Sequence, residues 1–122
     1  MRIRMIAPKI AAARLAGVSK LDPRGMASEA DIPGMCQAGL CLEVADDSGA
    51  AVLVVRLDNA GGVAWVDAAG GGGGRDLCGA IDAALSDMPI NAIAFQTKRP
   101  GLVRRAKRAG YYVAGYIMRR DL

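Results

Sequence analysis

The chain has 122 residues, of which 52% are hydrophobic, and this size and composition indicate one folded domain with a single core. The sequence contains no histidine, which excludes catalytic pairs in which histidine activates a serine or a cysteine. The net charge of +4 is unevenly distributed. Residues 1–87 carry eight basic and eleven acidic side chains, whereas residues 88–122 carry eight basic side chains and one acidic side chain.

The sequence also argues against a membrane span, secretion and a metal site. No apolar run reaches the roughly 20 residues that cross a bilayer, and residues 1–6 alternate charged with apolar side chains, unlike a signal peptide. Cys36, Cys41 and Cys78 lack CxxC spacing, which predicts buried thiols in a reducing compartment. We therefore expect a cytoplasmic protein with no metal and no membrane contact.

The first forty residues carry the weakest pattern. Residues 1–6 alternate as an edge strand does, residues 9–17 predict a short helix that ends at a glycine, and residues 28–38 predict another, with Pro33 near its start. Residues 1–39 are therefore interpreted either as a strand with short helices or as an extended arm that orders against a neighbouring molecule.

Three strands are predicted next, at residues 40–45, 50–57 and 63–68, with turn sequences between them. Residues 50–57 (AAVLVVRL) are almost continuously apolar, which is typical of a central strand covered on both faces. The three strands together predict an antiparallel meander.

The remainder alternates helices with strands. After five glycines at 70–74, helical spacing continues to residue 88, and residues 91–96 predict a strand. A second helix is predicted at 101–109, with Leu102, Ala106 and Ala109 on its apolar side, and a last strand at 111–118 (YYVAGYIM). The expected fold class is α/β of the α+β kind, with a mixed, largely antiparallel sheet flanked by helices; residues 40–122 form its core, and residues 1–39 belong to the same single domain.

This order of elements resembles the GNAT superfamily of N-acetyltransferases, and local motifs agree with it. The family's acyl-CoA loop reads Arg/Gln-x-x-Gly-x-Gly/Ala between a strand and a helix, where this chain has glycines followed by Arg75-Asp76-Leu77. Gly110-Tyr111 resembles the Gly-Phe step that opens a later strand in the family. The resemblance covers about residues 40–122, with the N-terminal part shortened, and looks closest to the short GNAT-like proteins of tailed phages and prophages.

The glycine-rich loop could hold the pyrophosphate of acetyl-CoA. Glycines let successive backbone N–H groups approach an anion, and the helix that follows adds positive partial charge. The residues concerned are Gly70, Gly71, Gly72, Gly73, Gly74 and Arg75. The alternative is a flexible connection, and Asp76 would repel a phosphate.

The resemblance also implies a degenerate active site. The helix tyrosine that protonates the departing thiolate in the family corresponds to Ala106, the preceding asparagine falls near Arg99, and the leading residue of the loop falls near Ala69. These departures leave the catalytic residues unknown.

Substitute catalytic groups are weak candidates. Tyr111, Tyr116 or the neighbouring Tyr112 could act as the acid, and Asp67, with Glu43 second, could act as the base. The alternatives are core packing for Tyr111 and solvated carboxylates at strand ends.

A cluster of basic residues accounts for the positive charge of the C-terminal third. Its members are Lys98, Arg99, Arg104, Arg105, Lys107 and Arg108. A coenzyme phosphate, an acidic protein surface and nucleic acid are all possible partners, and a solvated helix face needs no partner. We rank the solvated face and protein contact above nucleic acid.

Three functions follow. The first is a catalytically degenerate GNAT-fold protein of a phage or prophage, which acts in the host cytoplasm or in the virion as an accessory component through a protein partner or as a homo-oligomer. Its contacts would use the N-terminal segment or the basic C-terminal region. The second is an active acyl-CoA-dependent N-acetyltransferase, and the third is a nucleic-acid-binding module. An enzyme requires an open pocket beside the ends of the strands at 63–68 and 91–96, whereas a structural protein should have this cleft filled.

Overall fold

The computed structural model describes residues 1–22, 31–71 and 76–122. Within these ranges the elements are, in chain order, β1 (Arg2–Met5), α1 (Pro8–Leu15), α2 (Ile32–Ala38), β2 (Leu40–Asp46), β3 (Gly49–Asp58), β4 (Val63–Gly70), α3 (Leu77–Leu85), β5 (Ala92–Phe95) and α4 (Pro100–Arg108). The strands form one sheet in the order β1-β2-β3-β4-β5, and each pair is antiparallel except β4 with β5. The predicted mixed, largely antiparallel sheet flanked by helices is confirmed.

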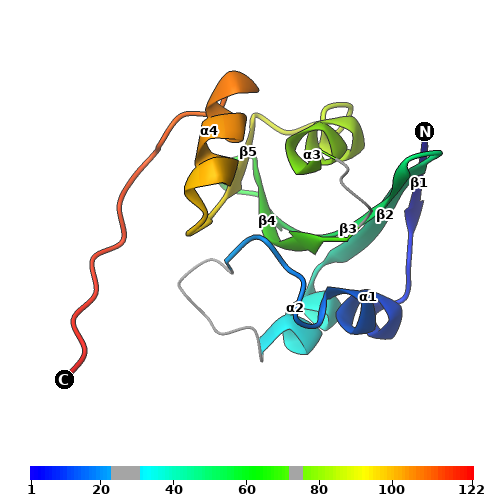
Figure 1. Cartoon of the computed structure of the whole chain (residues 1–122), viewed down its shortest axis with the longest axis horizontal. Helices are drawn as coiled ribbons and strands as arrows, with labels where there is room; N and C mark the ends of the chain where they lie inside the picture. The colour runs from blue at the N-terminus through cyan, green and yellow to red at the C-terminus, as the bar shows by residue number, and fades with distance from the viewer. Residues whose placement is uncertain (23–30, 72–75) are drawn as a thin grey trace.

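The sheet is the middle layer of three. Helices α3 and α4 cover one face, and α1 and α2 cover the other (Figure 1). Strand β3 lies at the centre of the sheet, and its residues 51–55 are all buried because they face a helical layer on each side. The prediction of a central strand covered on both faces is therefore confirmed.

The two helical layers enclose separate apolar clusters. Leu53 and Val55 of β3 pack with Ile81 and Leu85 of α3 and with Leu102 of α4. Residues of the opposite parity on β3 point to the other side of the sheet, where they pack against α1 and α2; this second cluster is Ala11, Leu15, Ile32, Cys36, Cys41, Val52, Val54 and Ala68. The period-2 alternation of a strand thus divides one apolar run between two cores.

The described residues of the N-terminal third include a strand and two helices. Strand β1 pairs with β2 at the edge of the sheet, and α1 buries Ala11 and Leu15 completely. Glu43 of β2 links both elements, because its carboxylate accepts hydrogen bonds from Arg4 Nε at 2.7 Å and from Arg14 of α1. These bonds lower the pKa of Glu43 below its ordinary value of 4.5, the bond from Arg4 contributing most.

The helices follow the predicted periodicity with small differences at their ends. Helix α3 ends at Leu85, three residues short of the expected limit, and α4 ends at Arg108, which leaves Ala109 exposed instead of on the buried side. Within the described ranges, none of the helices has both the length and the apolar character needed to span a membrane.

The predicted last strand at residues 111–118 is wrong. After Gly110, which has a φ of 96°, residues 111–122 are extended but pair with no strand of the described chain (Figure 1). A strand requires a partner for its backbone N–H and C=O groups, and this segment leads away from the sheet. We call residues 111–122 the C-terminal tail.

The interactions of Glu43 predict a pH-dependent contribution to stability. A carboxylate whose pKa is lowered on folding stabilises the native state above its unfolded pKa, and this contribution disappears as pH falls through the folded value. Replacing Glu43→Gln should therefore lower the free energy of unfolding at neutral pH, and the difference from the wild type should shrink as pH falls below 4.5. Denaturant titrations at several pH values measure this, and a difference that is constant with pH would contradict it.

Candidate functional site

The parallel strands β4 and β5 separate partway along their length. They pair from Val63 with Ala92 to Val66 with Phe95. Beyond this point β4 continues to Gly70, whereas β5 ends at Phe95. The separation leaves backbone groups on both strands without a ladder partner, at the position where an enzyme would require an open pocket and a structural protein would have it filled.

A segment from the N-terminal third of the chain occupies this gap. The N–H of Lys20 donates to the carbonyl oxygen of Ala69 on β4 at 2.8 Å. Two residues later, the N–H of Asp22 donates to the carbonyl oxygen of Gln96, directly after β5, at 2.8 Å. Residues 19–22, here called the wedge, are therefore hydrogen-bonded to both sides of the gap.

Side-chain hydrogen bonds and a buried leucine also hold the wedge in the gap. The Ala69 N–H donates to Ser19 Oγ at 3.2 Å, and Thr97 Oγ1 donates to the Lys20 carbonyl oxygen at 3.0 Å. Leu21 is only 4% exposed and packs into the cluster beneath α3 and α4. The wedge thus supplies both the hydrogen bonds and the apolar contact that a ligand would otherwise make in this gap.

Gly70 shows how closely the wedge approaches β4. A Cβ built on Gly70 would lie 2.5 Å from the carbonyl oxygen of Val18, which is backbone and cannot rotate away. A glycine is needed here because the two backbones approach each other so closely. Its neighbour Gly71 has a φ of 98°, which favours glycine for conformational reasons.

The proposed phosphate site is only partly covered by the described chain. Gly72, Gly73, Gly74 and Arg75 lie outside the described residues. The N-terminus of α3 is described, and Asp76 caps it by accepting a hydrogen bond from the Cys78 N–H at 3.2 Å. A carboxylate therefore already interacts with the first turn of the helix, where an anionic ligand would otherwise bind.

Asp67, the first candidate for a base, lies in a β-bulge. The register passes from Val54 with Ala68 to Val55 with Val66, so Asp67 is the additional residue on β4. Its side chain is fully buried and ion-paired with Arg56 of β3, which raises the pKa of Arg56, and Oδ1 has no hydrogen-bond partner in the described part of the chain.

A hollow of about 480 Å³ lies near this pair, beside α2. It is lined by Asp31, Gly34, Met35, Ala38 and Arg56. It is broadly open and lies on the α1–α2 side of the sheet, and Asp67 does not line it. The hollow therefore does not connect the candidate base with the gap between β4 and β5.

Glu43, the second candidate for a base, is not brought near Asp67. It lies on β2, with the whole of β3 between it and β4, and two arginines bind its carboxylate. A carboxylate whose pKa is lowered by arginine is a poorer proton acceptor.

The candidate acids lie in two different environments, one packed and two exposed. The ring of Tyr111 lies 5.1 Å from that of Phe95 between centroids, and burial, with smaller effects from Cys78 and Asp82, raises the pKa of Tyr111 to about 12. Such a phenol is a weak acid near neutral pH. Tyr112 and Tyr116 lie in the C-terminal tail and are 83% and 89% exposed.

The three cysteines are buried free thiols, as predicted. Burial is the main cause that raises the pKa of Cys41 to about 11, and it also raises the pKa of Cys78. Such thiols remain protonated and unreactive. No cluster of three or more potential metal ligands occurs among the residues that the structure describes.

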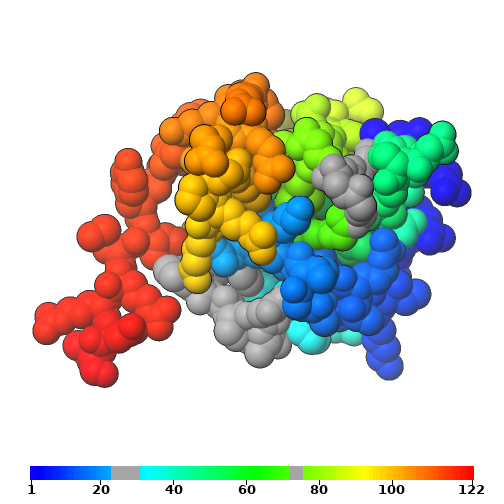
Figure 2. Space-filling model, viewed as in Figure 1, coloured from blue at the N-terminus to red at the C-terminus, as the bar shows by residue number. Residues whose placement is uncertain are grey.

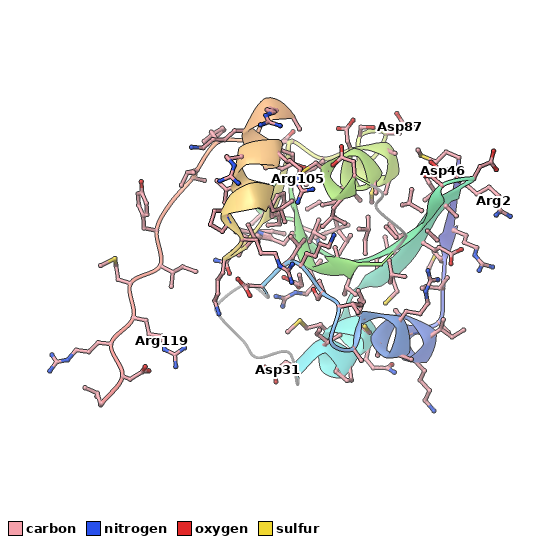
Figure 3. All side chains as sticks on the ribbon, viewed as in Figure 1. Arg2, Asp31, Asp46, Asp87, Arg105 and Arg119 are labelled. Carbon is pink, nitrogen blue, oxygen red and sulfur yellow. The ribbon has the colours of Figure 1, made fainter. Side chains whose placement is uncertain are left out.

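The basic residues are gathered at one end of the sheet. Lys98 and Arg99 are exposed just before α4, and the other four lie on the exposed side of α4, opposite Leu102 and Ala106. Arg105 extends toward α3 (Figure 3), and its charge acts on the Cys78 thiol. The cluster thus lies on the α3–α4 layer, on the other side of the sheet from the hollow beside α2.

Sequence reasoning did not identify the wedge as part of the site. Its sequence, Ser19-Lys20-Leu21-Asp22, has one apolar residue between charged ones and reads as a surface turn. The small polar Ser19 and the isolated Leu21 were the only local signals, and neither indicates a partner on β4 or β5.

Replacement of Gly70→Ala should displace the wedge. The added methyl group would overlap the Val18 carbonyl, and relief of such overpacking costs roughly 1–3 kcal/mol of unfolding free energy. Hydrogen exchange at the amides of Lys20 and Asp22 should also accelerate. Denaturant titration and exchange measured by mass spectrometry test both effects.

Gly34→Ala is the matched control, because a Cβ at Gly34 of α2 meets nothing within 4 Å. It should leave the wedge amides unchanged and alter stability by less than about 1 kcal/mol. Equal exchange rates at Lys20 in the two variants would contradict the close contact at Gly70.

The Arg56–Asp67 pair predicts an asymmetric mutational response. Arg56→Met leaves the buried carboxylate without its cation and should destabilise the fold by about 2–3 kcal/mol, a value reduced because Arg56 is partly exposed. Arg56→Met with Asp67→Asn removes the charge and should recover part of this loss. Thermal and chemical unfolding measure it; no recovery in the double variant would show that the charge is not the cause.

Comparison of the chain with family models, curated proteins and solved structures finds no match.

Proposed function

We propose that this chain is a catalytically inactive, GNAT-like protein that acts through contacts with other protein molecules. The resemblance of its motifs to the short proteins of tailed phages and prophages extends the proposal to an accessory or virion component. The main support for a loss of catalysis is that the wedge occupies the gap between β4 and β5.

The wedge supports this function because it competes with a substrate for the same hydrogen-bonding groups. The Ala69 carbonyl and N–H and the Gln96 carbonyl are already used by residues 19–22 of the chain itself. Entry of an acyl group would require these bonds to break and Leu21 to leave the core, at a cost that the ligand would have to supply.

The surrounding residues support the same conclusion. Asp76 caps α3, Arg56 neutralises Asp67, and the pKa of Tyr111 is far above neutral. Each of these groups is thus engaged in contacts within the chain that a general acid or base would have to give up. The side chain at the position of the family's acid is Ala106, which is buried in the core.

An active acyl-CoA-dependent N-acetyltransferase is the second candidate, because a strand followed by a glycine-rich connection and a helix is present. It requires the wedge to move out of the gap when the coenzyme binds. A nucleic-acid-binding role for the basic cluster is a third candidate, and it predicts binding that weakens steeply with salt.

Isothermal titration calorimetry with acetyl-CoA separates the first two functions. The wild-type chain is expected to give no binding heat up to millimolar ligand. The control variant carries Gly72→Asp and Gly74→Asp, which would place carboxylates where phosphates approach.

Binding by the wild type that is lost in this variant would show that the loop holds a coenzyme, and the proposal would then be wrong. Equal weak heats from both proteins would indicate non-specific association and would leave the acetyltransferase without support.

A further inference from the structure

The C-terminal tail has the composition of a buried strand but lies in solvent. Its exposed large apolar side chains are Tyr112 (83%), Val113 (50%), Tyr116 (89%), Ile117 (50%), Met118 (91%) and Leu122 (110%). In an extended segment, residues 112, 116 and 118 lie on one side and residues 113 and 117 on the other. Apolar residues on both sides are typical of a strand that is covered on both faces.

The tail stands clear of the rest of the molecule. It leaves the end of α4 and runs along the side of the molecule where β5 and α4 lie (Figure 1), and its atoms protrude from the body in the space-filling view (Figure 2). Tyr111 is the point of attachment, because its ring packs on Phe95 and its N–H donates to the Ala106 carbonyl at 3.0 Å. An exposed apolar segment of this extent indicates a surface for protein contact.

Among the described residues, β5 is an edge strand of the sheet, and it lies close to this attachment. It is the last strand of the sheet, and β4 is its ladder partner. The Ala92 N–H and the Gln96 carbonyl are directed to the β4 side, where they bond to Gly62 and to the wedge. Because alternate residues direct their backbone groups to opposite edges, Ile93 and Phe95 present theirs to the outer edge.

We propose that the tail of each molecule pairs as a strand with the β5 edge of a second copy of the same chain, and that the exchange is reciprocal. Donor strand and acceptor edge occur in one chain and in equal number, so two copies satisfy each other completely. Closed two-fold exchange of identical elements is a common route to dimers. This inference rests on the proposed protein-contact function, for which it names the partner.

The arrangement fits a two-fold axis. The two tails can lie side by side and antiparallel at the centre of the dimer. Each tail then also lies beside the β5 strand of the other copy, so that the two sheets join into one continuous sheet. Apolar side chains on both sides of each tail would then be covered, and the outer edge of β5 would be paired. A partner of a different kind would have to supply both an edge for the tail and a strand for β5, whereas a second copy of this chain supplies both.

The basic cluster predicts how dimer formation depends on salt. Helix α4 lies on the same layer as α3, so a two-fold axis perpendicular to the sheet brings the two α4 helices to the same face. Their like charges repel, and this repulsion is screened by salt. The dimer is therefore expected to strengthen as ionic strength rises, opposite to nucleic-acid binding.

The test is the mass of the full chain in solution, measured by light scattering during size-exclusion chromatography at micromolar to millimolar concentration. We expect twice the chain mass of 12.6 kDa. A variant with Val113→Pro and Tyr116→Pro removes one N–H from each edge of the tail and should be monomeric. The matched control is Arg120→Pro, beyond the apolar residues, which should remain dimeric; circular dichroism verifies folding of all three.

A second measurement tests the acceptor edge. A fluorescent peptide of residues 111–122 should bind the Val113→Pro/Tyr116→Pro variant, whose β5 edge is free, and a scrambled peptide of the same composition should not. Binding supports β5 as the acceptor. If the variant is monomeric but binds no peptide, the tails pair only with each other and the assignment to β5 is wrong.

Other results overturn the inference. A monomeric wild type would show that the tail folds onto its own β5 or remains free, and a dimer that survives the two prolines would use another surface. Both outcomes leave the calorimetric test of the coenzyme site unaffected. Conversely, the wild type could bind acetyl-CoA and also form a dimer that the two prolines abolish. This result would overturn the proposed loss of catalysis but would support the strand exchange.

Discussion

The separation of β4 from β5 is the constraint on which the rest of the structure depends. Once pairing stops at Val66 and Phe95, the backbone groups beyond them need partners, because buried N–H and C=O groups are costly to leave unpaired. The wedge supplies these partners from residues 19–22. It also joins the two layers, since Leu15 packs beneath the sheet whereas Leu21 packs above it. The chain thus crosses the plane of the sheet through the gap.

The sequence predicted much of the fold, because local periodicity and burial agree over residues 40–71 and 76–108. The run that became β3 has no polar residue in 50–55, and the spacing of Leu77, Ile81 and Leu85 places them on one face of α3. The prediction failed for residues 111–118, whose composition suits a strand but which pair with no strand of the described chain. Composition can indicate that a segment suits a sheet, but it cannot show whether a neighbouring strand is present to pair with it.

The candidate site was less predictable because its decisive contacts are long-range. Asp67, Tyr111 and the basic cluster were identified from residue type, yet their environments depend on Arg56, Phe95 and the course of α4. The bulge that turns Asp67 into the interior is a mismatch between two strands, and no single-strand pattern reveals it. The wedge is the clearest case, because Ser19 and Ala69 are 50 positions apart and Lys20 and Thr97 are 77 apart.

These separations have a consequence for folding order. The meander β2-β3-β4 joins neighbours in the chain, so it can form early, whereas the wedge docks only after loops of 50 and 77 residues have closed. During synthesis the wedge leaves the ribosome long before Gln96 and Thr97 exist. Ser19 and Lys20 can bond to Ala69 as soon as β4 is made, whereas Asp22 can bond to Gln96 only after β5 has followed. The two halves of the wedge therefore find their partners at different times during translation.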